Sequence, residues 1–246
     1  MYITDSHIHL QDFKSQKTEE IIELAYKNNV KSFINVSSNP NDWKEVISLS
    51  NKFSNITPAI GIHPWYSNNI SERHIQELED LLQKHQNLWV GECGLDKIKN
   101  KDLSSQLNIF VSQIHLANKY NRPLIIHSVH ANDETEKLFS ILPTKTIFHS
   151  YTGSIEWGNK IQKAGFYLGI NFSILKKKNS KDIINNLDIN KILLETDGPY
   201  QSPEKNCESL PSNLPYLVKY IANCFRINEI DLTEIFYNNW INFIKK

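Results

Sequence analysis

Short apolar runs alternate with longer amphipathic runs along the whole chain. The short runs are rich in Ile, Val, Leu and aromatic residues, and each is followed by Gly, Pro, Asn, Asp or Ser, which is typical of strands. Between them, apolar residues recur at helical spacing, as in the segment that contains Phe110 and Ile114. The predicted strands are residues 2–7, 32–37, 56–62, 88–93, 124–128, 146–150, 166–171 and 191–196.

Eight strands that alternate with helices predict an α/β fold with a parallel sheet, and eight is the number of strands that closes a barrel. We therefore expect a single TIM-type (β/α)8 barrel. The chain has no Gly/Ser/Pro-rich linker, internal repeat or low-complexity stretch, so residues 1–246 are expected to form one domain. Residues 198–215 are predicted to form a long loop after the last strand, and Asp231 is the predicted N-cap of the final helix.

Composition narrows the class of protein. The 246 residues include 27 basic and 27 acidic side chains, so no net charge draws in polyanions. A protein that coats nucleic acid is usually more basic. Three scattered cysteines argue against a disulfide framework and favour a reducing cytosol. The first residues lead directly into a strand, which predicts neither an export signal nor a membrane span and favours a cytoplasmic location.

Six acidic or imidazole side chains lie at the ends of predicted strands. Because the chemistry of such barrels takes place at the carboxyl ends of the strands, we expect these side chains to converge. Imidazole and carboxylate groups are common ligands of divalent metal ions, so the pattern predicts a buried metal centre at that end of the barrel. The candidate ligands are His7, His9, Glu92, His127, His149 and Asp197.

Each candidate alone also has an ordinary structural interpretation. His7 and His9 are two residues apart on an extended segment, which puts both side chains on one face, but such a pair is often only polar. A buried Glu92 could simply pair with a Lys or a His. Asp197 could form a turn, or it could accept a proton from an attacking water. His63 ends a further strand and could donate to a leaving group or hold substrate.

Lysines and aromatic residues follow the same strand ends. A solvated surface accounts for either lysine group alone, whereas aromatic faces beside lysines also suit the unstacked bases of a single strand. The lysines are Lys97, Lys99, Lys101 and the run 176–178, and the aromatic residues are Trp65, Tyr66, Tyr151, Phe172 and Tyr200.

Several short segments at these strand ends resemble the TatD family of metal-dependent hydrolases, within the amidohydrolase superfamily. The resemblance covers nearly the whole chain. The matching segments are Asp5-Ser-His-Ile-His-Leu10, Gly61-Ile-His-Pro64, Gly91-Glu-Cys-Gly-Leu-Asp96, Ile126-His-Ser128, His149-Ser-Tyr-Thr-Gly153 and Glu195-Thr-Asp-Gly-Pro-Tyr200. The resemblance implies a TIM-type barrel and a metal-dependent nuclease that acts on DNA, often as a 3′ to 5′ exonuclease.

The resemblance also implies one or two divalent ions, with zinc, manganese, iron or magnesium as candidates. In the resulting hypothesis, each ion is bound by a pair of histidines, one carboxylate bridges the ions, and another carboxylate deprotonates the attacking water. His7 and His9 bind one ion, and His127 and His149 bind the other. Glu92 is the bridging carboxylate, Asp197 is the carboxylate that deprotonates the water, and His63 assists catalysis. The expected substrate is a DNA end or single-stranded DNA.

The chain departs from the family pattern at two places. The family often has an Arg two residues after His127, where this chain has Val129, and an Arg-Asn-Glu-Pro loop where this chain has Ser212-Asn-Leu-Pro215. Only three residues of the chain are Arg, so it is poor in bidentate phosphate clamps. Two alternatives therefore stay open. One is a metal-dependent hydrolase of a small ester, amide or phosphate ester, and the other is a non-catalytic binding module, against which the complete ligand set argues.

Overall fold

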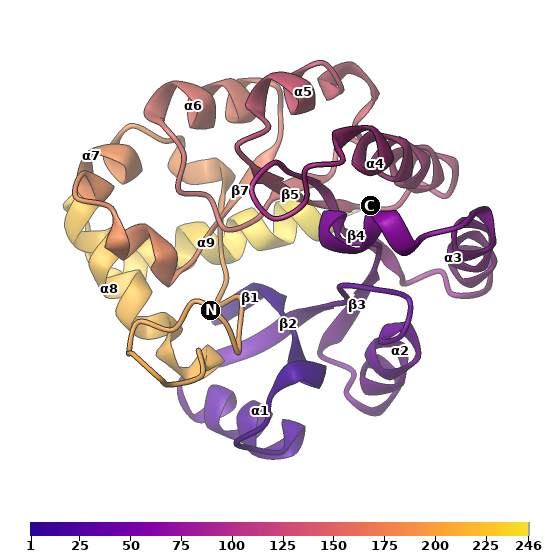
Figure 1. The fold of residues 1–246 in the computed structure, drawn as a ribbon. Coiled ribbons are helices and arrows are strands. Elements are labelled where there is room, and N and C mark those ends of the chain that lie inside the picture. The colour runs from indigo at the N-terminus through magenta and orange to yellow at the C-terminus, as the bar shows by residue number, and fades with distance from the viewer. Residues whose placement is uncertain (246) are drawn as a thin grey trace. The chain divides into compact units, whose positions relative to one another are not determined.

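The computed structural model describes residues 1–245, in which eight strands alternate with helices along the chain (Figure 1). The strand order in the sheet is the order in the chain. The chain divides into two compact units: unit 1 is Met1–Ile34 with Ser150–Lys246, and unit 2 is Asn35–His149. Strand β2 (Val30–Val36) crosses this boundary in the sequence. The expectation that residues 1–246 form one domain stays a prediction.

Unit 1 is built from parallel strands and five α-helices among its described residues. The strands are β1 (Ile3–Ile8), β7 (Tyr167–Ile170) and β8 (Ile192–Leu194), and the helices are α1 (Thr18–Lys27), α6 (Ile155–Lys163), α7 (Ser180–Asn185), α8 (Leu214–Phe225) and α9 (Glu229–Ile244). Strand β7 pairs with β8, and a parallel bridge joins Ile8 at the end of β1 to Gly198 after β8. Helix α9 packs against α8, β8 and β1.

Unit 2 repeats the alternation of strand and helix. The strands are β3 (Ile56–Ile60), β4 (Trp89–Asp96), β5 (Leu124–Val129) and β6 (Thr146–Phe148), and the helices are α2 (Trp43–Lys52), α3 (Glu72–Lys84), α4 (Leu103–Lys119) and α5 (Asn132–Glu136). Each strand pairs in parallel with the next, so their carboxyl ends lie at one edge. Helix α4 turns Phe110, Ile114 and Ala117 inward at helical spacing, as the sequence predicts.

Strand β4 is longer than its sequence pattern predicts. The predicted strand ends at Cys93 because Gly94 signals a turn. In the structure the pairing register shifts between Val90 and Cys93, after which β4 continues beside β5 to Asp96. A bulge of this kind bends a strand and redirects its side chains. Here it brings Gly94 level with His127 and Asp96 level with Val129 on β5.

The expectation about the N-cap of the last helix was wrong. Asn228, not Asp231, caps α9, since Oδ1 of Asn228 accepts a hydrogen bond from the backbone N of Asp231 at 2.8 Å. Asn228 has the extended backbone of an N-cap, and Asp231 lies in the first turn, where an acidic side chain suits the helix dipole. The long loop expected after β8 is present, but Pro215 lies outside it, because a 3-10 turn at Pro211–Asn213 leads directly into α8 (Leu214–Phe225).

Candidate metal centre

Two histidines and a carboxylate meet at the end of β1 in unit 1. Nε2 of His7 lies 3.1 Å from Nε2 of His9. Oδ1 of Asp197 lies 3.8 Å from Nε2 of His7 and 3.5 Å from Nε2 of His9. All three side chains are buried. We call these residues the unit 1 cluster. The expected common face of the two histidines is confirmed by their contact.

Backbone hydrogen bonds hold the unit 1 cluster together. The N–H of Asp197 donates to the carbonyl of His7 at 2.9 Å, and the N–H of His9 donates to the carbonyl of Gly198 at 2.7 Å. Asp197 has a φ of 56°, a left-handed conformation that Asp tolerates better than most residues. The two chain segments are thereby locked side by side, and the Asp197 carboxylate lies beside both imidazoles.

Asp5 holds the two chain segments of the unit 1 cluster together through hydrogen bonds. Its carboxylate accepts hydrogen bonds from the backbone N and the hydroxyl of Thr196, at 3.0 and 2.6 Å, and from the backbone N of His7 at 3.3 Å. Complete burial raises the pKa of Asp5 to about 7, although these hydrogen bonds oppose the rise. One side chain thus ties the strand that carries His7 to the segment that carries Asp197.

Glu195 is a further buried carboxylate of unit 1 that the sequence reasoning did not single out. Its Oε1 accepts hydrogen bonds from the backbone N of Ser150 at 2.7 Å and from Nδ2 of Asn171 at 3.0 Å. The signal was present in the sequence, because Glu195 directly follows the apolar pair Leu193-Leu194 and buried acids are rare unless they have partners. It holds Ser150, the residue that follows the candidate ligand His149, in place.

Three imidazoles surround one carboxylate oxygen in unit 2. Oε1 of Glu92 lies 2.8 Å from Nε2 of His149, 2.9 Å from Nδ1 of His127 and 3.3 Å from Nε2 of His63. Nδ1 of His127 also lies 3.2 Å from Nε2 of His149. We call these four residues the unit 2 cluster. Glu92 and His127 lie within β4 and β5, His149 directly follows β6, and His63 follows β3.

Neighbouring side chains in unit 2 shift the pKa values of Glu92 and His127 toward their charged forms. Burial alone would raise the pKa of Glu92, yet the neighbouring His149 and His63 hold it well below its ordinary value. Burial likewise opposes protonation of His127, but hydrogen bonds to Asp96 and Glu92 outweigh this effect and raise the pKa of His127. Glu92 is therefore an anion in a buried setting, where its charge attracts cations strongly.

Asp96 is a further carboxylate of unit 2, and in the sequence it stands out only as the last residue of the motif Gly91-Glu-Cys-Gly-Leu-Asp96. Its Oδ2 lies 3.2 Å from Nε2 of His127 and accepts a hydrogen bond from the indole Nε1 of Trp65 at 2.6 Å. Its Oδ1 accepts from the backbone N of Ile98 and of Lys99. Burial opposes ionisation, but these hydrogen bonds, led by the one with His127, lower the pKa of Asp96. A carboxylate behind a histidine in this way orients the imidazole.

His63 contacts the other members of the unit 2 cluster from its position directly before a 3-10 segment (Pro64–Asn69). Its Nδ1 accepts a hydrogen bond from the backbone N of Trp65 at 3.2 Å, so in the neutral ring the proton is on Nε2, which faces Glu92. Burial lowers the pKa of His63 to about 4, and the nearby Glu92 only partly compensates. The structure thus brings His63 into contact with Glu92, whereas sequence reasoning had kept it apart from the ligands.

The donor sets of both clusters fit a divalent cation. Two ligand atoms that each lie ~2.1 Å from a tetrahedral ion are about 3.4 Å apart. The separations in the unit 1 cluster, 3.1, 3.5 and 3.8 Å, lie on either side of this value. In unit 2, one ligand atom from each of His63, Glu92 and His127 falls within 4.8 Å of the others. Mixed nitrogen and oxygen donors suit zinc, manganese or iron, while magnesium prefers oxygen.

Comparison with known proteins identifies the family. Residues 4–245 match the family model described as TatD related DNase. The chain belongs to the TatD related DNase family. An uncharacterized metal-dependent hydrolase of Methanocaldococcus jannaschii is 28% identical over 98% of this chain and 96% of its own length. The human deoxyribonuclease TATDN3 is 26% identical over 99% of this chain and 95% of its own length. The resemblance drawn from the strand-end motifs is confirmed.

Solved structures of TatD proteins share the fold of this TatD-family chain. The crystal structure of a TatD homologue from Escherichia coli has a TM-score of 0.91, with 22% identity, over 98% of this chain and 97% of that chain. A TatD-family hydrolase from Entamoeba histolytica has a TM-score of 0.89, with 21% identity, over 98% and 97% of the two chains. The prediction of a TIM-type (β/α)8 barrel with eight parallel strands is confirmed.

The aromatic residues expected near the strand ends of the TatD-family chain differ in exposure. Trp65, Tyr66 and Tyr200 expose large parts of their rings, with 48% of Trp65 accessible. Tyr151 and Phe172 are buried, so their rings offer no exposed face to the bases of a single strand. Sequence alone does not separate the two groups, because a ring after a strand packs inward or outward according to the next turn of the chain.

The lysines of the TatD-family chain also have different surroundings. Nζ of Lys97 forms an ion pair with Glu134 at 3.0 Å. Nζ of Lys99 lies 5.5 Å from the centre of the Trp65 ring, in a cation–π contact. In unit 1, Nζ of Lys176 donates to Oε1 of Gln201 at 3.2 Å. Lys99 is therefore the lysine of this set that contacts an exposed aromatic ring next to the unit 2 cluster.

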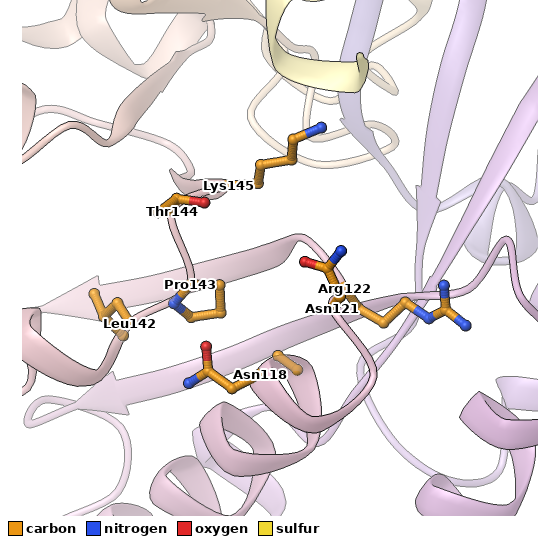
Figure 2. Close-up of a pocket in the computed structure, with 8 residues that line it drawn as sticks. Asn118, Asn121, Arg122, Leu142, Pro143, Thr144 and Lys145 are labelled. Carbon is orange, nitrogen blue, oxygen red and sulfur yellow. The ribbon is translucent and has the colours of Figure 1, made fainter. Parts of the chain in front are cut away.

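A pocket of about 200 Å³ in unit 2 lies away from this chemistry (Figure 2). It is lined by the end of α4, by Asn121 and Arg122 before β5, and by Leu142–Lys145 before β6. These residues precede the two strands, whereas His127 and His149 lie at their other ends. The pocket contains none of the candidate ligands and is not the candidate active site.

Among the helices described in residues 1–245, none combines the length and the apolar character needed to cross a bilayer. The cytoplasmic location expected from the sequence stays a prediction.

Proposed function

We propose that this protein is a metal-dependent deoxyribonuclease that hydrolyses phosphodiester bonds near DNA ends or in single-stranded DNA, with 3′ to 5′ exonuclease action, in the cytoplasm. Two lines of evidence support this. The chain belongs to a family described as TatD related DNase, and relatives over nearly its full length include a protein named deoxyribonuclease. The observation that carries the proposal is the buried Glu92 oxygen within 3.3 Å of three imidazoles, because carboxylate and imidazole donors gathered in this way suit a divalent cation.

In the proposed site, three residues of each cluster would hold a divalent ion. A bound cation of this kind supplies Lewis acidity: it lowers the pKa of a nearby water and neutralises charge on phosphoryl oxygens. Zinc, manganese, iron and magnesium are the candidates. The ligands would be His7, His9 and Asp197 in unit 1. In unit 2 they would be Glu92, His127 and His149, because Nε2 of His149 lies 2.8 Å from Oε1 of Glu92 and 3.2 Å from Nδ1 of His127. The bridging role expected for Glu92 stays a prediction.

Asp197 and His63 are the proposed catalytic residues. The Asp197 carboxylate lies beside both imidazoles of its cluster, where it can also accept the proton of an attacking water. His63 accepts at Nδ1 from the backbone N of Trp65, and its Nε2 lies 3.3 Å from Oε1 of Glu92, so the neutral ring can donate a hydrogen bond to Glu92 or to a substrate oxygen that approaches it. Burial keeps His63 neutral at physiological pH, since its pKa falls to about 4.

The test is a digestion assay with controlled metal content. The protein is stripped with a chelator, reloaded with each of the four metals in turn, and offered single-stranded DNA, double-stranded DNA and RNA labelled at one end. We expect metal-dependent release of nucleotides from DNA by the wild type and its loss in Glu92→Ala and Asp197→Asn. Glu23→Ala and Asp182→Asn, which change exposed carboxylates, serve as matched controls. Full activity of both cluster variants would overturn the proposal.

One observation favours a second candidate, a hydrolase of small esters, amides or phosphate esters. None of the three arginines follows the carboxyl end of a strand: Arg73 is in α3, Arg122 precedes β5 and Arg226 ends α8. Arginine is the usual bidentate partner of a phosphate, so extended phosphate binding would have to use lysines or the cations. Metal-dependent turnover of small esters by a protein that leaves DNA intact would select this candidate.

A further inference from the structure

The indole of Trp65 is exposed and at the same time firmly held. Its accessible fraction is 48%, although a tryptophan gains much from burial. Its Nε1 donates to Asp96 at 2.6 Å, and its ring meets the ring of His63 edge to face at 4.7 Å between centres. Because one edge is hydrogen-bonded and another packs on a histidine, the exposed surface has a defined orientation.

The indole is also directly connected to the unit 2 cluster. The carboxylate oxygen of Asp96 that accepts from Trp65 lies 3.2 Å from Nε2 of His127. The ring centres of Trp65 and His127 are 6.3 Å apart. A planar group stacked on this indole would therefore lie next to the residues proposed to act on a phosphodiester bond.

The ammonium group of Lys99 lies close to the indole of Trp65. Nζ of Lys99 lies 5.5 Å from the centre of the Trp65 ring, and the backbone N of Lys99 donates to Asp96 at 2.9 Å. The side chain of Lys99 is exposed, so its ammonium can turn from the indole to an anion nearby. Asp96 thus fixes both members of the pair, the ring through its N–H and the lysine through its backbone.

We propose that Trp65 and Lys99 form a nucleobase-binding subsite beside the unit 2 cluster, in which a base of single-stranded nucleic acid stacks on the indole and Lys99 contacts an adjoining phosphate. Base stacking on an aromatic side chain is tolerant of sequence, and a lysine contact adds a salt-dependent contribution. The indole is held before the ligand arrives, so stacking costs little side-chain entropy. This inference rests on the proposed function, for which it names the substrate contact.

The experiment separates base stacking from a role of Trp65 that acts only through Asp96. Binding is measured with two fluorescent ten-residue strands that carry phosphorothioate linkages to resist hydrolysis. One is a thymidine oligomer, and the other is an abasic oligomer with the same number of phosphates. Trp65→Phe removes the hydrogen bond to Asp96 but keeps an aromatic face, whereas Trp65→Leu removes both. Tyr216→Leu, at an exposed ring on α8, is the control.

We expect Trp65→Leu to weaken binding of the thymidine oligomer about tenfold and to leave binding of the abasic oligomer unchanged. Trp65→Phe should retain most of the preference for the oligomer with bases. Lys99→Gln should weaken both oligomers and reduce the slope of log affinity against log salt by about 0.7. Equal effects of Trp65→Leu on both oligomers, or identical behaviour of Trp65→Leu and Trp65→Phe, would overturn the subsite.

Failure of the proposed function has a different signature. If wild-type protein releases nucleotides from DNA with added metal while Trp65→Leu binds both oligomers normally, only the subsite is wrong. If the wild type releases no nucleotides from DNA with any of the metals, the deoxyribonuclease proposal is wrong, and the oligomer comparison still decides whether Trp65 binds bases.

Discussion

A side chain at Gly94 would collide with the backbone of His127. The two residues face each other across β4 and β5, and a Cβ atom at Gly94 would overlap the carbonyl oxygen of His127. Gly94 also has a φ of +136°, a conformation that residues with a side chain rarely adopt. The close approach of these strands holds the His127 imidazole beside Glu92, so the absence of a side chain at Gly94 is part of the construction of the unit 2 cluster.

Gly94→Ala should therefore lower the free energy of unfolding by about 2 to 4 kcal/mol, from the overlap together with the backbone strain. Urea unfolding followed by circular dichroism measures this loss. Gly165→Ala is the matched control, because Gly165 has a φ of +102° but no atom within 4 Å of the added Cβ. The control should lose only about 1 kcal/mol. Equal losses in the two variants would contradict a role for the overlap.

Asp96→Asn should weaken metal binding by about 10- to 100-fold, because the charge that orients and polarises His127 is lost. Competition with a chromogenic chelator measures the affinity. Asp102→Asn makes the same chemical change at the N-cap of α4, where Asn caps equally well, and should have no effect. Unchanged metal affinity in Asp96→Asn would show that Asp96 serves only the turn formed by Ile98 and Lys99.

Replacing Lys176, Lys177 and Lys178 together by Gln should raise KM for DNA and flatten its dependence on salt, because each lysine that neutralises a phosphate releases counterions. Digestion kinetics at several salt concentrations measure both quantities. A triple variant of the exposed Lys27, Lys31 and Lys219 controls for net charge. If the two triple variants have the same KM and the same salt dependence, the run 176–178 is ordinary surface charge.

Asn228→Ala should lower the free energy of unfolding by about 1 kcal/mol, since the side chain that accepts from the backbone N of Asp231 is removed. Thermal and urea unfolding both report this change. Asp231→Asn keeps a polar side chain in the first turn and should cost only a few tenths of a kcal/mol through the helix dipole. A larger loss of unfolding free energy in Asp231→Asn than in Asn228→Ala would indicate that Asp231 is the N-cap.

Metal-binding chemistry was accessible from the sequence because parallel strands place their carboxyl ends at one edge. Once strands are recognised from their apolar runs, the residue after each run is predicted to lie at that edge. His7 with His9, and Glu92 with His127, meet within their units for this reason. Asp96 escaped this reasoning because the bulge in β4 extends the strand past the glycine that signals a turn.

The linear order of residues was enough to predict the alternation of strands and helices, the barrel and the six candidate ligands, because periodicity and strand ends are local properties of a chain. Tertiary structure alone decided that Asn228 caps α9, that Tyr151 and Phe172 are buried, that Glu195 and Asp96 support the clusters, and that Trp65 stays exposed beside Lys99. Each of these depends on what a side chain meets after the chain has folded, and partners distant in the sequence leave no local pattern.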